Sequence, residues 1–279
     1  MTPETLVEVA LPEVPLTVEG ASVLHQMMRF RWTAWRALAA GTRSEILAEA
    51  TSALEAMEKP DSGRQSAVFS MLGHKGDLMF VHFRRTFEEL SHAQLQIAKL
   101  RLSDYLEPAS SYLSLVELSL YESTSDTYAG LAQRGIKPHS EEWKKEIEIV
   151  LERHRKAMAP RLWPEVPPAK YICFYPMDRR RGESQNWYKE PIADRQRMMK
   201  EHGLIGRRYA GEVRQIITGS IGFDDWEWGV DLFAEDPAVF KKLIYEMRFD
   251  HVSAVYALFG TFYVGLRVPA SGLAGLLQV

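Results

Sequence analysis

The sequence predicts an α+β protein built from two halves that share one order of elements, β-α-β-β-α-β. Three observations support this: a hydrophobic content of 46%, short apolar runs bounded by turn residues, and helical spacing of apolar residues between those runs. With 279 residues, the chain is long enough for one large domain or two of ordinary size. We therefore expect a globular chain with a substantial core.

The first half begins with an apolar, strand-like stretch at residues 23–32. Ser44 is expected to cap a helix whose apolar residues recur at helical spacing as far as Lys59, which precedes a proline. Two short strands are predicted at residues 66–72 and 77–83. The turn sequence GHKG joins them, which predicts an antiparallel pair.

A second helix of this half is indicated by Thr86 and Glu89, which have the spacing of a capping box. Residues 112–120 have the pattern of a strand that closes the half. The stretch that follows, residues 122–160, is a polar connector with one expected helix, for which Ser140 is the N-terminal cap. This connector could pack on the sheets or on a neighbouring subunit, and the sequence favours neither.

The second half repeats the order of elements. One helix is expected to begin at Pro191, and another has Asp236 as its cap and Pro237 at its first position. In the stretch DWEWGVDLF, apolar and polar residues alternate, which predicts a strand with one buried face. The four strands of this half are expected at residues 170–175, 213–221, 226–233 and 252–264.

Each half therefore has the pattern of a ferredoxin-like unit, a four-stranded antiparallel sheet with its helices on one side. The opposite faces of the two sheets can pack together as a barrel-like sandwich. We place the two halves at residues 20–121 and 161–279, with the connector at residues 122–160.

Composition excludes several classes of protein. The formal charge is −3, so no global basic surface favours nucleic acid or an anionic membrane. Cys173 is the only cysteine, which excludes an internal disulfide and a multi-cysteine metal site. The first sixteen residues are acidic rather than basic, and no apolar stretch reaches the length of a membrane span. We expect a cytoplasmic protein that binds anions only locally.

Two polar residues lie where they suggest chemistry. His202 precedes Gly203 at the expected end of the helix that Pro191 begins; it could interact there with the helix dipole or serve as the single axial ligand of a haem iron. Gln215 is expected to share a strand face with apolar neighbours. Such a position implies a buried hydrogen-bond partner or a cavity that holds a ligand.

A run of three arginines follows an apolar strand and Tyr175 in the stretch CFYPMDRRRGESQNWY. Taken alone, it could be a solvated loop. The wider sequence resembles the coproheme decarboxylases of the chlorite dismutase-like superfamily, in the branch typical of Firmicutes. The resemblance runs from Pro160 to Gly265 through the segments PRLWPEVPPAKYICFYPMDRRR, NWY and HGLIGRRYAGEVRQIITGSIGFDDWEWGVDLF and their continuation, and SYLSLVELSLYE adds to it in the first half.

The resemblance implies a doubled ferredoxin-like fold, a homopentamer, and a C-terminal half that holds the porphyrin while the N-terminal half holds none. It implies His202 as the proximal iron ligand, Tyr175 as the residue that forms a radical, and Gln215 as the distal residue. Arg179 stands where relatives carry a lysine, and the connector is longer than usual. The positions implied to contact propionates or their surroundings are Tyr121, Arg161, Met177, Arg179, Arg207, Arg248 and Ser253.

The activity implied is the oxidative decarboxylation of two propionates of iron-coproporphyrin III (coproheme) to vinyl groups, with hydrogen peroxide as oxidant and haem b as product. The resemblance also allows for transient contact with the coproporphyrin ferrochelatase. Two alternatives stay open: a chlorite dismutase or haem peroxidase that uses haem b, and a haem-binding or haem-transfer protein without turnover. A neutral Gln215 disfavours chlorite chemistry, which the family links to a distal arginine, and an oxidisable Tyr175 disfavours simple binding.

Overall fold

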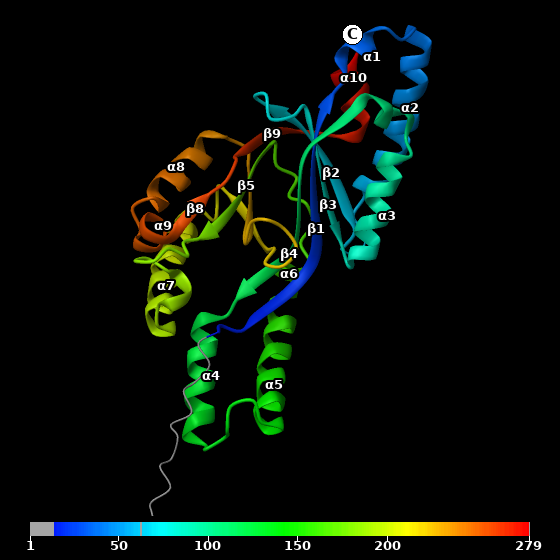
Figure 1. Cartoon of the computed structure of the whole chain (residues 1–279). Helices are drawn as coiled ribbons and strands as arrows, with labels where there is room; N and C mark the ends of the chain where they lie inside the picture. The colour runs from blue at the N-terminus through cyan, green and yellow to red at the C-terminus, as the bar shows by residue number, and fades with distance from the viewer. Residues whose placement is uncertain (1–13, 62, 279) are drawn as a thin grey trace, which may run out of the picture.

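The computed structural model describes residues 14–61 and 63–278. Within them, nine strands form one sheet in the order β7-β6-β4-β1-β3-β2-β9-β5-β8, and every pairing is antiparallel (Figure 1). The strands are β1 (Thr17–Phe30), β2 (Gln65–Leu72), β3 (Leu78–Arg84), β4 (Leu106–Ser119), β5 (Tyr171–Arg179), β6 (Arg214–Gly219), β7 (Trp228–Ala234), β8 (Ala257–Phe259) and β9 (Tyr263–Val268).

Helices cover the outer faces of this sheet. In Figure 1, α2 and α3 lie on one side, α7, α8 and α9 lie on the other, and the α4–α5 hairpin extends away from both. The α-helices are α1 (Trp32–Arg36), α2 (Ala40–Glu58), α3 (Phe87–Ala98), α4 (Tyr121–Gln133), α5 (Glu141–Ala157), α6 (Ala159–Leu162), α7 (Ile192–Arg208), α8 (Ala238–Met247), α9 (His251–Tyr256) and α10 (Leu273–Leu277). Three short 3₁₀ segments are η1 (Arg101–Tyr105), η2 (Trp187–Lys189) and η3 (Ala270–Gly272).

The two halves share one strand order. The first half pairs its strands as β2-β3-β1-β4, and the second pairs them as β6-β7-β5-β9, the same arrangement of first, second, third and fourth strands. The α+β class and the ferredoxin-like order are thus confirmed. The halves are joined edge to edge, because β4 pairs with β6 and β2 pairs with β9.

The inner faces of both halves enclose one apolar core. Phe69 and Phe83 of the first half and Phe174 and Phe233 of the second are all buried in it. Full burial of such a side chain contributes roughly 1.5–3 kcal/mol to folding. Separate apolar clusters lie between the sheet and its helices, one under α2 and α3 and one under α8. The sheet face under α7 and α8 is the one that carries the candidate site.

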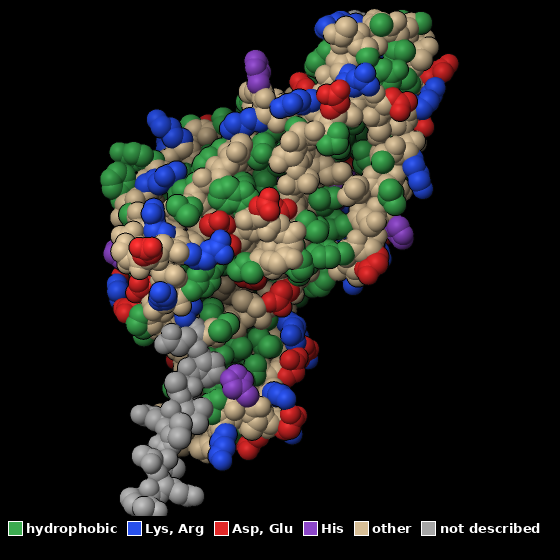
Figure 2. All heavy atoms as spheres, in the orientation of Figure 1, with side chains coloured by type: hydrophobic (Ala, Val, Ile, Leu, Met, Phe, Trp, Pro, Cys, Tyr) green, Lys and Arg blue, Asp and Glu red, His purple; other side chains and the backbone are tan. Residues whose placement is uncertain are grey.

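The surface charges are mixed rather than segregated. On the face that Figure 2 shows, basic and acidic side chains alternate over the helices and over the α4–α5 hairpin. This distribution agrees with the nearly balanced composition of 34 basic and 37 acidic residues. Any anion that the protein binds must therefore meet a local group of cations, as the composition predicts.

Several expected element boundaries were wrong. Ser44 does not cap its helix: α2 begins at Ala40, and the Ser44 hydroxyl donates to the Ala40 carbonyl within the helix. His202 does not end its helix, because α7 continues through Gly203 to Arg208 in helical geometry. Glycine permits a left-handed cap but does not impose one, and apolar contacts further along α7 maintain the helix.

The stretch 252–264 was expected to be a strand, but it is divided. Asp250 caps the short helix α9, and the strand pairing begins only at Ala257. The connector at residues 122–160 contains two long helices, α4 and α5, rather than one. The Ser140 cap of α5 is confirmed, since its hydroxyl accepts from the Trp143 amide at 3.1 Å.

Strand β7 is buried on both faces, whereas the alternation predicted one. Its carboxylate Asp231 is fully buried in the inner core instead of facing water. No helix in the described part of the chain is long and apolar enough to cross a membrane. The acidic stretch at the start of the chain falls largely in residues 1–13, which lie outside the described residues.

Candidate functional site

Strand β5 carries three of the expected site residues on one face. Alternate side chains of a strand point to the same side, so Tyr175, Met177 and Arg179 share a face while Phe174 points the other way. Tyr175 and Met177 belong to the apolar cluster beneath α8, and Phe174 belongs to the inner core. The strand continues through Pro176, so it brings the first arginine of the run into the protein interior.

Tyr175 is buried against two aromatic rings. Its ring stacks on Phe262 at a centroid distance of 4.6 Å and lies 5.7 Å from Phe259. Burial raises the pKa of its phenol well above the ordinary value, although the nearby charges of Arg179 and Arg248 oppose the shift. The phenol is therefore neutral at physiological pH. Its hydroxyl makes no hydrogen bond within the described part of the chain.

Arg179 is a buried cation with one unused donor. Its side chain is 8% exposed, its Nη2 donates to Met199 Sδ at 3.6 Å, and its guanidinium lies 5.2 Å from the Trp187 ring centroid. Its Nη1 is buried and has no hydrogen-bond partner among the described residues. Burial lowers the pKa of Arg179, as expected for a desolvated cation. Such a group suits an anionic atom of a ligand.

The other two arginines of the run fasten the loop that follows. Arg180 is half-buried, and its Nε donates to the Val255 carbonyl at 3.1 Å. Arg181 is exposed, and its Nε lies 3.5 Å from Glu227 Oε1. Glu227 also accepts the backbone amide of Arg179 at 2.8 Å. Of the three arginines, only Arg179 therefore has a buried hydrogen-bond donor without a partner among the described residues.

His202 lies on the face of α7 that packs toward the sheet. His202 lies at helical spacing from three apolar residues, Met198, Ile205 and Tyr209. Met198 packs in the cluster around Trp187, and Ile205 and Tyr209 pack in the cluster beneath α8. The His202 Nδ1 lies 2.9 Å from Asp250 Oδ2, and the imidazole is 23% exposed. With Nδ1 donating to the carboxylate, the lone pair of Nε2 is available to bind a metal.

Asp250 is held as a carboxylate by its neighbours. Its Oδ1 accepts the Ser253 amide at 2.8 Å as the cap of α9, and its Oδ2 accepts the Ser253 hydroxyl at 3.1 Å. Burial opposes ionisation, but the hydrogen bonds from His202 and Ser253 outweigh it and lower the pKa of Asp250. An ionised partner fixes the tautomer and orientation of the imidazole and increases its basicity.

Gln215 extends from β6 toward α7. Its Oε1 lies 3.9 Å from the position that a Cβ would take on Gly206, one turn beyond His202. Its neighbours Val213 and Ile217 pack under the helices, as expected from their spacing, but Gln215 itself is exposed. Its amide makes no hydrogen bond to any described residue, so it is accessible to solvent or to a bound ligand.

Tyr121 is linked to Arg179 through Trp187, whose ring contacts both side chains. It is the first residue of α4, and its ring meets Trp187 edge-on at 6.4 Å. Burial raises the pKa of its phenol, and the charges of Arg195 and Arg179 oppose that shift.

The remaining candidates divide into two groups. Arg248 stacks over Phe259 at 4.0 Å and so lies beside Tyr175. Arg161 on α6 and Arg207 on α7 are exposed, and no hydrogen bond or ion pair between described side chains links either of them to the site. The structure therefore brings most of the expected residues together, whereas these two arginines make no such contact with them.

Sequence reasoning missed several residues that complete this site. Trp187 and Met199 hold Arg179, Glu227 holds the strand end, and Asp250 holds His202. The spacing of Asp250 and Ser253 is that of a helix cap and could have indicated α9. The contacts of Trp187 and Met199 depend on tertiary packing, and no local pattern predicts them.

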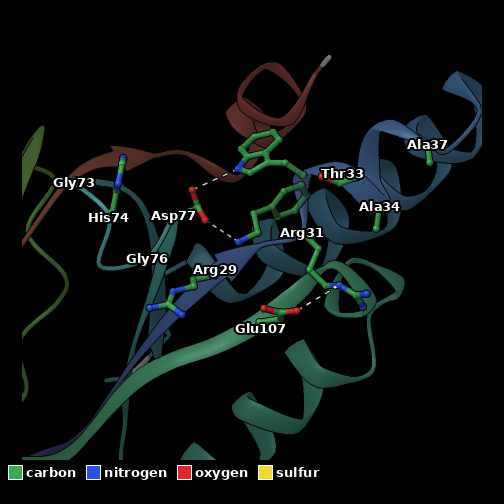
Figure 3. A pocket seen from close by; sticks show the side chains of 12 residues that line it. Arg29, Arg31, Thr33, Ala34, Ala37, Gly73, His74, Gly76, Asp77 and Glu107 are labelled. Carbon is green, nitrogen blue, oxygen red and sulfur yellow. Dashed lines mark hydrogen bonds and ion pairs between the residues drawn. The ribbon is translucent and has the colours of Figure 1, made fainter.

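A large open cavity lies away from these residues. It has a volume of about 800 Å³ and is lined by residues 29–34, 37, 73, 74, 76, 77 and 107 (Figure 3). Its carboxylates are already engaged: Asp77 accepts from the Phe30 amide and the Trp32 indole, and Glu107 pairs with Arg31. The chemistry of the candidate site is therefore separate from this cavity.

Comparison with known proteins identifies the family. Residues 43–268 match the family model described as Chlorite dismutase. The chain belongs to the chlorite dismutase family. A solved structure from Thermus thermophilus, described as a novel heme-binding protein, is 36% identical, with 96% of this chain and 99% of that chain covered and a TM-score of 0.81.

More distant members of the chlorite dismutase family share the fold. The chlorite dismutase from Candidatus Nitrospira defluvii in complex with imidazole is 19% identical, with 93% of this chain and 96% of that chain covered and a TM-score of 0.67. A neutral imidazole with a carboxylate on Nδ1 fits an axial iron ligand.

Proposed function

We propose that this chain is a hydrogen-peroxide-dependent coproheme decarboxylase that converts two propionates of coproheme to vinyl groups and yields haem b. The observation that carries the proposal is the pairing on β5: a buried, oxidisable Tyr175 lies on the same face as a buried Arg179 with an unused Nη1. Simple haem binding requires no oxidisable side chain beside a propionate-binding cation.

The residues present fit coproheme in three ways. His202 would hold the iron through Nε2, because Asp250 occupies Nδ1. Arg179, with Tyr121 beside it, would pair with a propionate, since a guanidinium binds carboxylates through parallel hydrogen bonds. Gln215 would face the bound ring from β6 as a neutral amide. The expected homopentamer and the transient contact with ferrochelatase belong to this proposal as well.

Tyr175 is the residue that would transfer oxidation to the substrate. The iron of bound coproheme would supply the oxidising equivalents on reaction with hydrogen peroxide. Tyr175 gives up its phenolic hydrogen as an electron and a proton, and then takes a hydrogen atom from the β-carbon of a propionate. The carbon radical loses one electron to the oxidised centre, carbon dioxide leaves, and a vinyl group remains. Each propionic acid group and one hydrogen peroxide thus give one vinyl group, one carbon dioxide and two water molecules.

Two other functions of the family are the competing candidates. Chlorite dismutation is disfavoured by Gln215, since a neutral amide offers no charge to hold an oxyanion. Haem binding without turnover is the function that the description of the Thermus thermophilus relative would favour. Peroxide-dependent turnover separates these candidates.

The deciding experiment uses the full chain, ferric coproheme and stepwise additions of hydrogen peroxide, with product masses followed in time. We expect two successive losses, each of carbon dioxide and two hydrogens, that end at haem b. Matched additions of peroxide to free coproheme serve as the control. Coproheme recovered with all four propionates, while the protein releases oxygen from chlorite, would replace this proposal with chlorite dismutation.

A further inference from the structure

Arg195 is a second buried arginine on the face of α7 that carries His202. It is 4% exposed, although it lies near the start of the helix, where arginine is usually solvated. Arg195, Met199 and His202 follow at spacings of four and three residues and so share one helix face. Arg195 and His202 are seven positions apart, which corresponds to about 10 Å along the helix. That length is comparable to the span from the centre of a porphyrin to carboxylates on its edge.

Arg195 and Arg179 approach one place from two elements. Arg179 reaches across from β5 to Met199, one turn from Arg195 along α7. Helix α4 packs on α7 at the same level, where the Ser125 hydroxyl donates to Gln196 at 2.7 Å. Tyr121, the first residue of α4, lies near both guanidinium groups. Two cations and a phenol therefore meet at one edge of the site.

The carboxylates nearest to Arg179 have other partners. Glu227 accepts the Arg179 backbone amide and pairs with Arg181, and Asp250 is engaged by His202 and Ser253. The buried Nη1 of Arg179 therefore has no acceptor among the described residues, and burial of such a donor is costly unless a ligand accepts from it. The N-terminal end of the seventeen-residue helix α7 adds further positive potential there.

We propose that Arg195 is a specificity-determining residue that, together with Arg179, binds the carboxylates of a porphyrin with carboxylates on more than two of its pyrrole rings. This inference rests on the proposed function, because it takes His202 as the iron ligand of a bound metalloporphyrin. Arg195 selects the tetracarboxylate ring over a dicarboxylate ring, whose corresponding edge carries uncharged vinyl groups. A planar guanidinium suits this role better than an ammonium group.

The test measures binding of metal-free porphyrins, so that neither iron nor peroxide takes part. Fluorescence titrations compare coproporphyrin III, with four carboxylates, and protoporphyrin IX, with two. Arg195→Gln should lower the affinity for coproporphyrin by about tenfold or more and the affinity for protoporphyrin by less than about threefold. Arg195→Lys, which keeps the charge, should recover part of the loss and also serves if the glutamine variant does not fold.

The matched control is Arg197→Gln on the same helix. Arg197 is exposed and pairs with Asp194 at 3.2 Å and with Glu201 at 3.7 Å, so its loss should change neither affinity by more than about twofold. Equal weakening of both porphyrins by Arg195→Gln, no weakening at all, or failure of the unmodified protein to bind coproporphyrin would overturn the inference. Selective binding without peroxide-dependent decarboxylation would overturn the proposed reaction and leave this role of Arg195 standing.

Discussion

His25 on β1 pairs with Asp231 on β7 across the junction of the two halves. The His25 Nε2 lies 2.9 Å from Asp231 Oδ1, the residues are 206 positions apart, and both side chains are fully buried. The His25 ring also stacks on Phe174 at 3.9 Å. The second polar atoms of the pair, His25 Nδ1 and Asp231 Oδ2, have no hydrogen-bond partner among the described residues. The pair ties the halves together at the cost of desolvating two polar groups.

Removal of one member of this pair should destabilise the protein more than removal of both. His25→Phe leaves a buried carboxylate without a partner, which costs about 3–5 kcal/mol. His25→Phe combined with Asp231→Leu replaces the pair with apolar side chains and should recover most of that loss. Urea unfolding of both single variants and the double variant gives the coupling energy. Strictly additive losses would show that the two side chains do not interact energetically.

His82 should make the stability of the first half depend on pH. Burial, reinforced by the charge of Arg84, lowers the pKa of His82 to about 3. The neutral ring lies 2.8 Å from Ser66 Oγ and 3.1 Å from Gln26 Oε1. In the unfolded chain the pKa of this histidine is about 6.5, so below that pH the unfolded state binds a proton that the native state does not bind. Stability should therefore be full above that pH and fall by roughly 1.4 kcal/mol per pH unit as the pH drops toward 3.

The His82 contribution can be isolated by substitution. His82→Gln keeps hydrogen-bonding groups but cannot titrate, so its free energy of unfolding should lose about 2 kcal/mol less than that of the unmodified protein between pH 7 and pH 5. His92→Gln, at an exposed position of α3, is the control. Parallel pH profiles for the unmodified protein and His82→Gln would show that another group governs the acid limb.

The order of strands and helices along each half could be predicted from the sequence, because it follows from local periodicity. The residues at 173, 175 and 177 have the period of a strand, and Val213 and Ile217 have the period that places Gln215 between them. The sequence was insufficient where tertiary contacts override local signals. Gly203 permits a helix end, yet α7 continues because Ile205 and Tyr209 pack against the core beyond it.

Burial of charge was the other feature that local patterns could not predict. Asp231 alternates with apolar residues as a solvent-facing carboxylate would, but its partner lies on a strand of the other half. Arg179 is a second example. Its position at the start of an arginine run suggests a side chain exposed to solvent, whereas its contacts with Trp187 and Met199 arise only from the fold.

Asp250 should tune His202 as an iron ligand. Asp250→Asn keeps an oxygen acceptor but removes the charge, so the imidazole becomes less basic and the iron–histidine bond weaker. We expect the iron–histidine band of the ferrous haem complex to shift to lower frequency in resonance Raman spectra, and His202→Ala to abolish it. Asp236→Asn, at an exposed position just before α8, should leave the band unchanged. An unaltered band in His202→Ala would remove His202 from the site.

Gln215 should decide how the site treats anions. A neutral amide gives little attraction to an oxyanion, so the unmodified protein should release negligible oxygen from chlorite. Gln215→Arg should strengthen the binding of cyanide or fluoride to the ferric haem complex by about tenfold while peroxide-dependent decarboxylation persists. Anion titrations followed by absorbance and an oxygen electrode provide the two measurements. Rapid oxygen release from chlorite by the unmodified protein would contradict the proposed function.

Arg179 should affect the rate of the second decarboxylation rather than the oxidation itself. Arg179→Ala removes the cation that orients a propionate but leaves Tyr175 in place, so the first decarboxylation should continue and the second should slow. The singly decarboxylated porphyrin should then accumulate in a mass-resolved time course. The exposed Arg181→Ala is the matched control from the same run. A complete block before the first decarboxylation would show that Arg179 is needed for both steps.

Tyr175→Phe separates folding and binding from oxidation. The substitution keeps the ring that stacks on Phe262 and removes only a hydroxyl that has no partner among the described residues, so stability and coproheme affinity should change by less than about 1 kcal/mol. Decarboxylation should stop at the starting material, because a phenylalanine ring yields no hydrogen atom that a bound oxidant can remove.

Tyr171→Phe, at the start of the same strand and on the same face, retains Tyr175 and should react normally. The radical signal expected by electron paramagnetic resonance on peroxide addition should vanish in Tyr175→Phe and persist in Tyr171→Phe. Full conversion of coproheme to haem b by Tyr175→Phe would exclude this tyrosine as the residue that oxidises the propionates.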